Sequence, residues 1–221
     1  MKTKLERFAL GLLLAPLAPL AGLMGFWWLS YAILPEKWIS IGALTGLALG
    51  ILADIFLLKI LLDRAHRLSL VFWVAVLLFY AVGIFGFFMG VPVFNTTLAI
   101  PAGFVIGGRL AHEVADRSRV HTATLRTCIL TTILLACICA ASAFFALISP
   151  STPRDLEGML GLSFAITPAM IWSIILVGGA GLLAINWVLT GLSVRLTVRF
   201  LSAPEAHGAV RAGGEAERKW L

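Results

Sequence analysis

A single carboxylate, Asp54, lies inside an otherwise apolar stretch of the chain. It follows Trp38 by sixteen residues, which corresponds to about 24 Å along an α-helix. A charge at the centre of a membrane-spanning helix costs about 2.5–3.5 kcal/mol, so it usually faces protein or water and has a partner. Asp54 is therefore the first residue whose type and position indicate chemistry.

Arg109 is the best candidate partner for this carboxylate. If the span that holds Arg109 begins near Pro92, Arg109 lies seventeen residues along it, at almost the same depth as Asp54. Lys59 is less suitable, because it points to another helix face and can extend to the membrane interface. We expect an Asp54–Arg109 ion pair, and two roles for it stay open: fixing helix registry, or forming a gate or ligand site.

Uncharged polar residues form a second group with chemical capacity. Asn95 and Thr96 lie near the start of an apolar stretch, and Pro101 frees a backbone carbonyl within it. Asn186 is an amide inside the last apolar stretch. Such side chains can line a cavity and bind a solute by hydrogen bonds, or they can join neighbouring helices. Asn95, Thr96 and Asn186 are therefore candidate substrate-binding residues, with helix joining as the alternative.

The sequence offers little for metal binding or catalysis. His112 and Asp116 have the i, i+4 spacing of paired helix residues, but a third ligand is not evident. The three cysteines, Cys128, Cys137 and Cys139, lie in one apolar stretch. On a helix, Cys137 and Cys139 point to nearly opposite sides, so they cannot bind one metal together. G-x-S-x-G, H-E-x-x-H, Walker A and dinucleotide motifs are missing from the sequence. We therefore expect no enzyme, no cofactor and no metal site.

Glycines recur at helical spacing in two of the apolar stretches. Gly42, Gly46 and Gly50 precede Asp54 at steps of four residues. Gly103 and Gly107 form a shorter version of the same pattern. Because small residues allow two helix backbones to approach closely, both groups are predicted to be helix-packing ridges.

The elements that must position these residues are predicted from composition. The 221 residues are 60% hydrophobic and only 13% charged, with a mean hydropathy of +1.00, whereas soluble domains are about a quarter charged. Helices satisfy their own backbone groups in lipid. We therefore predict an all-α polytopic membrane protein with six transmembrane helices, at about 8–33, 38–61, 69–90, 92–111, 125–148 and 167–193.

The basic residues predict the orientation of these spans. Of the 17 Lys and Arg residues, all but Lys37 and Arg154 fall on the side that holds the N-terminus. This asymmetry places both termini in the cytoplasm and the protein in the cell inner membrane. The net charge of +6 then faces anionic lipid headgroups, so a nucleic-acid partner is not needed to explain it.

The chain divides into one membrane domain and a tail. Residues 1–201 form the predicted six-helix domain, and residues 202–221 are small and polar and are expected to be a disordered cytoplasmic tail. The last apolar region is too long for one span. We expect a short interfacial helix at 155–166, followed by a span that begins at Pro168.

Two resemblances extend this interpretation. Residues 42–54, GALTGLALGILAD, together with six spans and basic cytoplasmic loops, resemble the substrate-binding subunits of energy-coupling-factor transporters. Those subunits bind a vitamin or a metal and associate with a separate membrane subunit and ATPases, although no vitamin-binding pattern carries over to this chain. Residues 85–95, FGFFMGVPVFN, are similar to a string in small six-span bacterial membrane proteins of unassigned function.

These observations favour a solute-binding or transport-related membrane protein. Its polar site would lie between the second and fourth helices, at Asn95 and Thr96, and would be closed on the inner side by Asp54 and Arg109. The alternative is a non-catalytic subunit or scaffold whose glycine ridges pack a partner. The predicted partners are the lipid bilayer, with a small solute, another membrane protein or a second copy of the chain left open.

Overall fold

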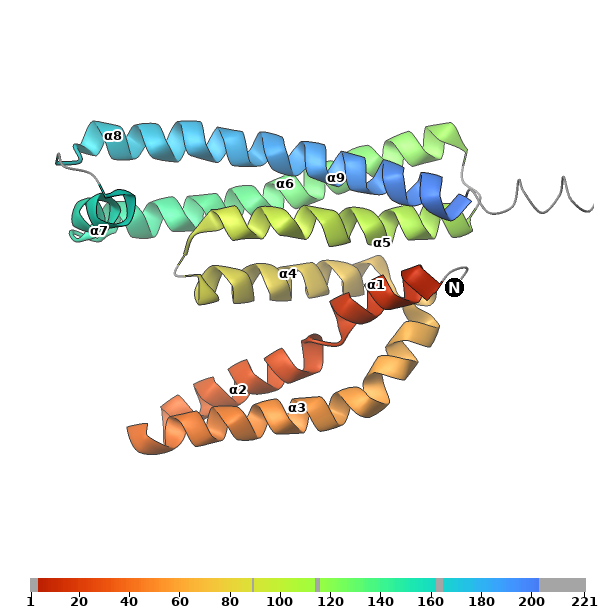
Figure 1. Cartoon of the computed structure of the whole chain (residues 1–221), viewed down its shortest axis with the longest axis horizontal. Coiled ribbons are helices and arrows are strands. Elements are labelled where there is room, and N and C mark those ends of the chain that lie inside the picture. The colour runs from red at the N-terminus through yellow and green to blue at the C-terminus, as the bar shows by residue number, and fades with distance from the viewer. Residues whose placement is uncertain (1–3, 89, 114–115, 162–164, 203–221) are drawn as a thin grey trace, which may run out of the picture. The chain divides into compact units, whose positions relative to one another are not determined.

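The structure is a computed structural model that describes residues 4–88, 90–113, 116–161 and 165–202, and all regular elements in these ranges are helices (Figure 1). Six helical segments within the described residues are long and apolar enough to cross a membrane. The predicted all-α class is therefore confirmed. The chain forms two compact units, Met1–Val76 and Leu77–Leu221, which are described separately below.

Unit 1 is built around a helical hairpin. Its elements are α1 (Lys4–Leu14), α2 (Leu17–Ile33), α3 (Glu36–Arg64), the short 3₁₀-helix η1 (Ala65–Arg67) and the part of α4 (Leu70–Phe87) up to Val76. The predicted first span, 8–33, is interrupted at Ala15 and Pro16, because a proline inside a helix removes a backbone hydrogen bond. The second span is a continuous helix, as predicted.

The backbones of α2 and α3 touch along a row of glycines. A Cβ atom at Gly22 of α2 would collide with the carbonyl oxygen of Gly46 on α3, and one at Gly46 would collide with the carbonyl oxygen of Gly22. A Cβ at Gly50 would lie only 2.6 Å from Cα of Pro19. The row 42–46–50 is therefore occupied by a helix of the same unit.

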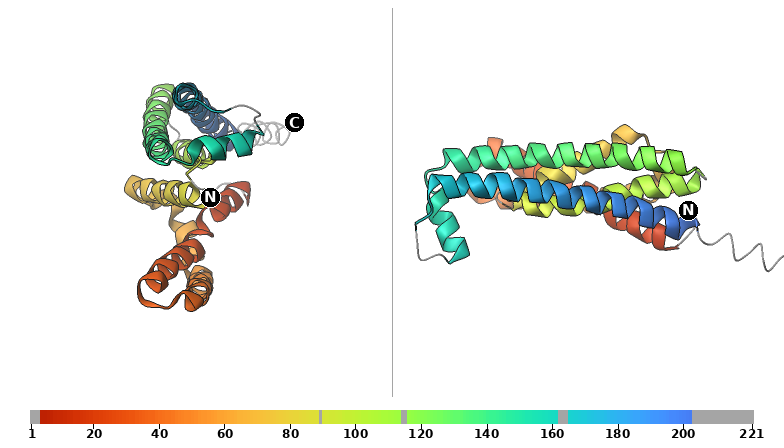
Figure 2. Two further views of the ribbon diagram at one scale, coloured as in Figure 1. Left: turned by 90° about the vertical axis from the view of Figure 1, so that its left-hand side faces the viewer. Right: turned by 90° about the horizontal axis from the view of Figure 1, so that it is seen from above.

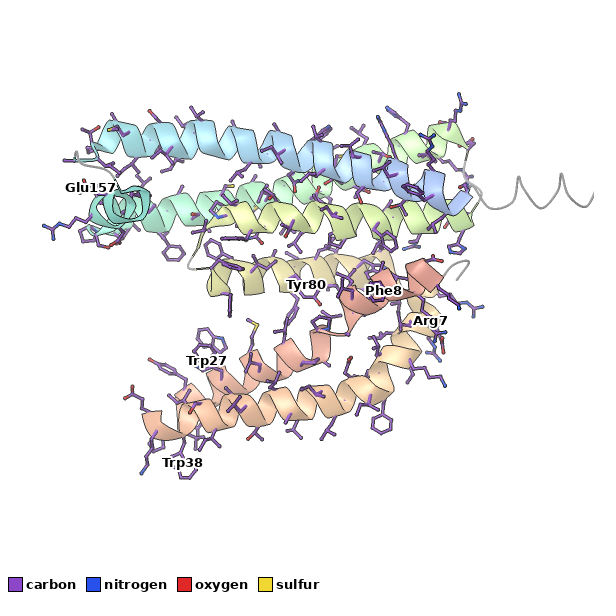
Figure 3. All side chains as sticks on the ribbon, viewed as in Figure 1. Arg7, Phe8, Trp27, Trp38, Tyr80 and Glu157 are labelled. Carbon is purple, nitrogen blue, oxygen red and sulfur yellow. The ribbon has the colours of Figure 1, made fainter. Side chains whose placement is uncertain are left out.

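The two ends of unit 1 differ in the residues that they carry. Trp27 on α2 and Trp38 near the start of α3 lie toward the turn that joins these helices (Figure 3). Arg7 on α1 lies at the other end of the unit, where its guanidinium is 3.7 Å from the Asp63 carboxylate. Tryptophan near the end of an apolar helix is typical of a segment that crosses a bilayer.

Unit 2 contains three long helices that lie side by side, α5, α6 and α9 (Figures 1 and 2). Its elements are α4 from Leu77 onward, the 3₁₀-helix η2 (Pro92–Leu98), α5 (Ala99–His112), α6 (Arg117–Ile148), α7 (Thr152–Leu160), α8 (Pro168–Ser173), the π-helix η3 (Ile174–Gly178) and α9 (Gly179–Ser202). The core of the unit lies between these helices.

Glycines also bring α5 close to α9. A Cβ at Gly103 would lie 2.9 Å from the carbonyl oxygen of Thr190, and one at Gly107 would lie 2.8 Å from that of Val194. The hydroxyl of Ser193 donates a hydrogen bond of 2.7 Å to the Ile100 carbonyl of α5. The pair Gly103 and Gly107 therefore packs against a helix of its own unit.

Several helix boundaries differ from those predicted. The third span ends at Phe87 rather than at 90, and α9 continues to Ser202 rather than ending at 193. The fourth span begins as the 3₁₀-helix η2, and the fifth begins at Arg117, because the basic connector before residue 125 continues as helix. A short helix is present near the one predicted at 155–166, but it is α7, Thr152–Leu160, and it lies across one end of the unit (Figure 2). Pro168 begins the last span, as predicted, and residues 203–221 of the predicted tail lie outside the described residues.

Candidate functional site

A tight turn between α4 and η2 positions Asn95. Gly90 has a φ of 82°, a left-handed conformation that glycine adopts without steric cost, and its N–H donates 2.8 Å to the Phe85 carbonyl. The rings of Phe88 and Phe94 stack with their centroids 3.9 Å apart. Pro92 then begins η2, where proline fits because the first helical N–H has no intrahelical acceptor. The turn therefore brings Asn95 onto the helix surface that contacts α6 and α9.

The carboxamide of Asn95 is buried without a partner. The side chain is 4% exposed, and neither its Nδ2 nor its Oδ1 makes a hydrogen bond within the described part of the chain. A buried polar group that is left unpaired costs about 1–3 kcal/mol. Since most buried polar groups in proteins are paired, an unpaired one is a candidate partner for a water, an ion or a ligand.

Asn186, by contrast, is held in a hydrogen-bonded network between α6 and α9. Its Nδ2 donates to the hydroxyls of Thr131 and Thr132, each at 3.3 Å. The hydroxyls of Thr131 and Thr190 are 3.0 Å apart, and Thr190 also donates to the Asn186 carbonyl at 2.8 Å. The network therefore fixes the orientation of the Asn186 amide.

Asn95 and Asn186 line the same small cavity. Its volume is about 10 Å³, measured as the space in which the centre of a water molecule fits, which is room for about one water. Polar groups come from Asn95, Thr131 and Asn186. The rest of the wall is apolar and comes from Leu77, Ala81, Leu98, Ala99, Leu134, Leu135 and Ile138.

The arrangement can bind a small uncharged molecule. A carboxamide presents two N–H donors and an acceptor oxygen, so Asn95 can bind a group that both donates and accepts hydrogen bonds. The residues that line the cavity carry no charge. A charged ligand would therefore enter without a compensating charge, at high cost in an apolar bundle.

The described walls of the cavity come from the third, fourth, fifth and sixth spans. The predicted site between the second and fourth spans stays a prediction, because these spans belong to different units. Thr96 is buried beside Asn95 but does not line the cavity, and its hydroxyl donates 2.6 Å to the Val93 carbonyl. Thr96 therefore supports the turn of η2.

Sequence reasoning missed Thr131. Its hydroxyl also lies 3.1 Å from the Thr127 carbonyl, one turn earlier in α6. A threonine in an apolar helix usually makes such a bond to its own helix. The presence of a threonine therefore does not by itself predict a binding site. Thr131 lies on the same helix face as Thr124 and Thr127, which are also buried. This spacing of threonines was the sequence signal that could have indicated a polar helix face.

Asp54 and Arg109 belong to different units. Asp54 lies on α3 in unit 1, and its Oδ1 is buried without a hydrogen-bond partner among the described residues. Arg109 lies on α5 in unit 2 and is half-buried. The proposed ion pair between them stays a prediction.

The described residues contain no group of three or more His, Cys, Asp or Glu side chains that could hold a metal ion. The polar cavity in unit 2 is therefore the candidate site. The chain matches no protein-family model, no curated protein and no solved structure in the comparisons made.

Proposed function

We propose that this chain is a multi-pass inner-membrane protein, with both termini in the cytoplasm, that binds a small uncharged solute in a transport-related role. The six long apolar helices support the membrane assignment. Large apolar side chains are exposed on these helices, for example Phe56 at 73% and Val71 at 76%, as expected of surfaces that contact lipid. The distribution of Lys and Arg supports the orientation.

The unpaired carboxamide of Asn95 carries the solute-binding part of the proposal. Asn186 has the same chemistry and lies at the same cavity, yet it has two hydroxyl partners. If both amides served only to join helices, both would be expected to reach a partner. Asn95 therefore has hydrogen-bonding capacity that the bundle itself does not use.

The size of the cavity defines the class of solute. In the described conformation the space suits a single water molecule. A larger solute requires the surrounding helices to separate, and it must then satisfy the Asn95 amide. Water, urea and glycerol meet these conditions, since each is small, uncharged and both donates and accepts hydrogen bonds.

The test is solute permeation through proteoliposomes that contain the full chain, measured by stopped-flow light scattering with urea, glycerol and water. Permeation of at least one of the three solutes should be faster through liposomes with the wild-type protein than through protein-free liposomes. Asn95→Leu should lose this excess. The control Thr97→Val changes an exposed residue on the same turn, whose hydroxyl donates only to the Phe94 carbonyl, and should keep the excess. Wild-type permeation equal to that of protein-free liposomes for all three solutes would reject the proposal.

The alternative of a scaffold that packs a partner through its glycine ridges receives less support. Gly22, Gly46 and Gly50 lie at the contact between α2 and α3, and Gly103 and Gly107 lie against α9. These glycines are occupied within the chain, so a partner would need another surface. The resemblance to substrate-binding subunits of energy-coupling-factor transporters is in line with solute binding.

A further inference from the structure

A second pocket lies in unit 2, between the N-terminal end of α6 and the C-terminal part of α9. Its volume is about 320 Å³, measured in the same way as the first. The residues that line it are Arg117, Val120, His121, Thr124, Arg195 and Val198. This pocket is separate from the polar cavity in the residues that form it.

The spacing of these residues explains why they meet. Four of them follow one another at i, i+3, i+4 and i+7 on α6, which places them on one helix face. Arg195 and Val198 are three residues apart on α9 and share a face in the same way. Because α6 and α9 pack together, the two faces form opposite walls of one groove.

The residues that line the pocket include two arginines and no acidic residue. Arg117 and Arg195 make no ion pair with a described residue. The nearest acidic side chain in the sequence, Asp116, accepts a hydrogen bond of 2.8 Å from the N–H of Arg119. The Thr124 hydroxyl donates to the Val120 carbonyl at 2.7 Å. The donors left for a ligand are therefore two guanidinium groups and the His121 imidazole.

This set of donors matches a phosphate group. A guanidinium presents parallel N–H donors that fit two phosphate oxygens, and an anion between two such groups offsets their mutual repulsion. Val120 and Val198 add apolar wall beside the charges, which suits the carbon skeleton of a phosphate ester. We propose that the pocket between α6 and α9 binds a phosphate group, either of an anionic lipid or of a soluble phosphate.

The location fits both sources. In the proposed orientation, the end of α6 that holds Arg117 lies at the cytoplasmic side of the membrane, where anionic headgroups and soluble phosphates are both present. The inference does not depend on the solute site at Asn95, because the two pockets share no residue.

The test has two arms on the full chain. In the first, the protein is released from detergent, and native mass spectrometry counts the phosphatidylglycerol molecules bound to it. Phosphatidylcholine is the reference lipid. In the second, calorimetry measures inorganic phosphate binding in detergent without lipid. The variant is Arg117→Gln with Arg195→Gln. All four arginines are exposed, and the control, Arg119→Gln with Arg199→Gln, removes the same charge from residues of the same helices that do not line the pocket.

Loss of two charge-assisted contacts should weaken binding by about tenfold or more in the variant, with little change in the control. Selective phosphatidylglycerol binding assigns the pocket to a lipid headgroup, and inorganic phosphate binding assigns it to a soluble ligand. Either result supports the proposal. If neither probe binds, or if variant and control weaken equally, the proposal is wrong. Should the Gln variant fail to fold, Arg117→Lys with Arg195→Lys keeps the charge but loses the paired N–H donors. Its binding of the phosphate probe should also be weaker than that of the wild type.

Discussion

The two units of the chain hold their helices together in different ways. In unit 1, α2 and α3 meet at Gly22, Gly46 and Gly50, where the backbones themselves are in contact. In unit 2, α5 meets α9 at Gly103 and Gly107 by the same device, but α6 and α9 also exchange side-chain hydrogen bonds.

The difference identifies polar residues in unit 2 that helix packing alone does not require. Lipid provides little hydrophobic drive for helices to associate, so close contact between small residues supplies much of the attraction. In unit 1, α2 and α3 meet mainly through backbone contact at glycines. The polar residues of unit 2 add hydrogen bonds to this packing, except that the Asn95 amide bonds to none of the described residues. Three substitutions test this comparison.

The largest effect is expected at the contact of α2 with α3. Gly22→Ala would place a methyl group against the Gly46 backbone, which cannot move as a side chain does. We expect a loss of about 1–3 kcal/mol in the free energy of unfolding, measured by SDS titration in mixed micelles. The matched control is Gly25→Ala on the same helix, where a Cβ meets nothing within 4 Å. It should be neutral or stabilise by up to about 1 kcal/mol, since alanine favours helix over glycine. Equal behaviour of the two variants would show that the glycines do not hold the hairpin.

A smaller loss is expected at the network between α6 and α9. Asn186→Leu removes the bonds to Thr131 and Thr132, and such interhelical bonds are worth about 0.6–1.7 kcal/mol in membrane proteins. The same SDS titration should show this decrease. The control Ser173→Ala removes a hydroxyl that donates only to the Ala169 carbonyl of its own helix, and it should change little. A loss as large as that for Gly22→Ala would mean that unit 2 depends on its polar network more than on its glycines.

The smallest effect on stability is expected at Asn95. Asn95→Leu replaces an unpaired buried amide by an apolar side chain of similar size, so the free energy of unfolding should stay the same or rise. The same substitution should abolish solute permeation. A decrease in stability comparable with that of Asn186→Leu would show that Asn95 joins helices, and the distinction between the two amides would fail.

Much of the fold could be predicted because membrane spans and their ends depend on the local hydrophobicity and charge of the sequence. The six apolar stretches, the start of the last span at Pro168 and the short helix before it all follow from composition and from proline positions. The early start of α6 could not be predicted firmly, because the basic connector before residue 125 has the composition of either a loop or a helix.

The site could be predicted only in part. Asn95 and Asn186 stand out because amides are unusual in apolar stretches, and the structure places both at one cavity. Which helices surround them depends on tertiary packing, which local sequence patterns do not reveal. The phosphate pocket was hidden for a similar reason, since Arg117 and Arg195 are indistinguishable in sequence from other cytoplasmic basic residues.

The π-helix η3, Ile174–Gly178, has a consequence for how the chain can vary in length. A turn closed over five residues accommodates one more residue than an α-turn, and none of the residues of η3 is buried. Deletion of one residue here would restore a regular helix and leave Asn186 and Thr190 in register with α6. Along α2 and α3 the same deletion would rotate Gly22 away from Gly46. Natural single-residue insertions and deletions are therefore expected to accumulate at η3 and to be eliminated from the glycine contact.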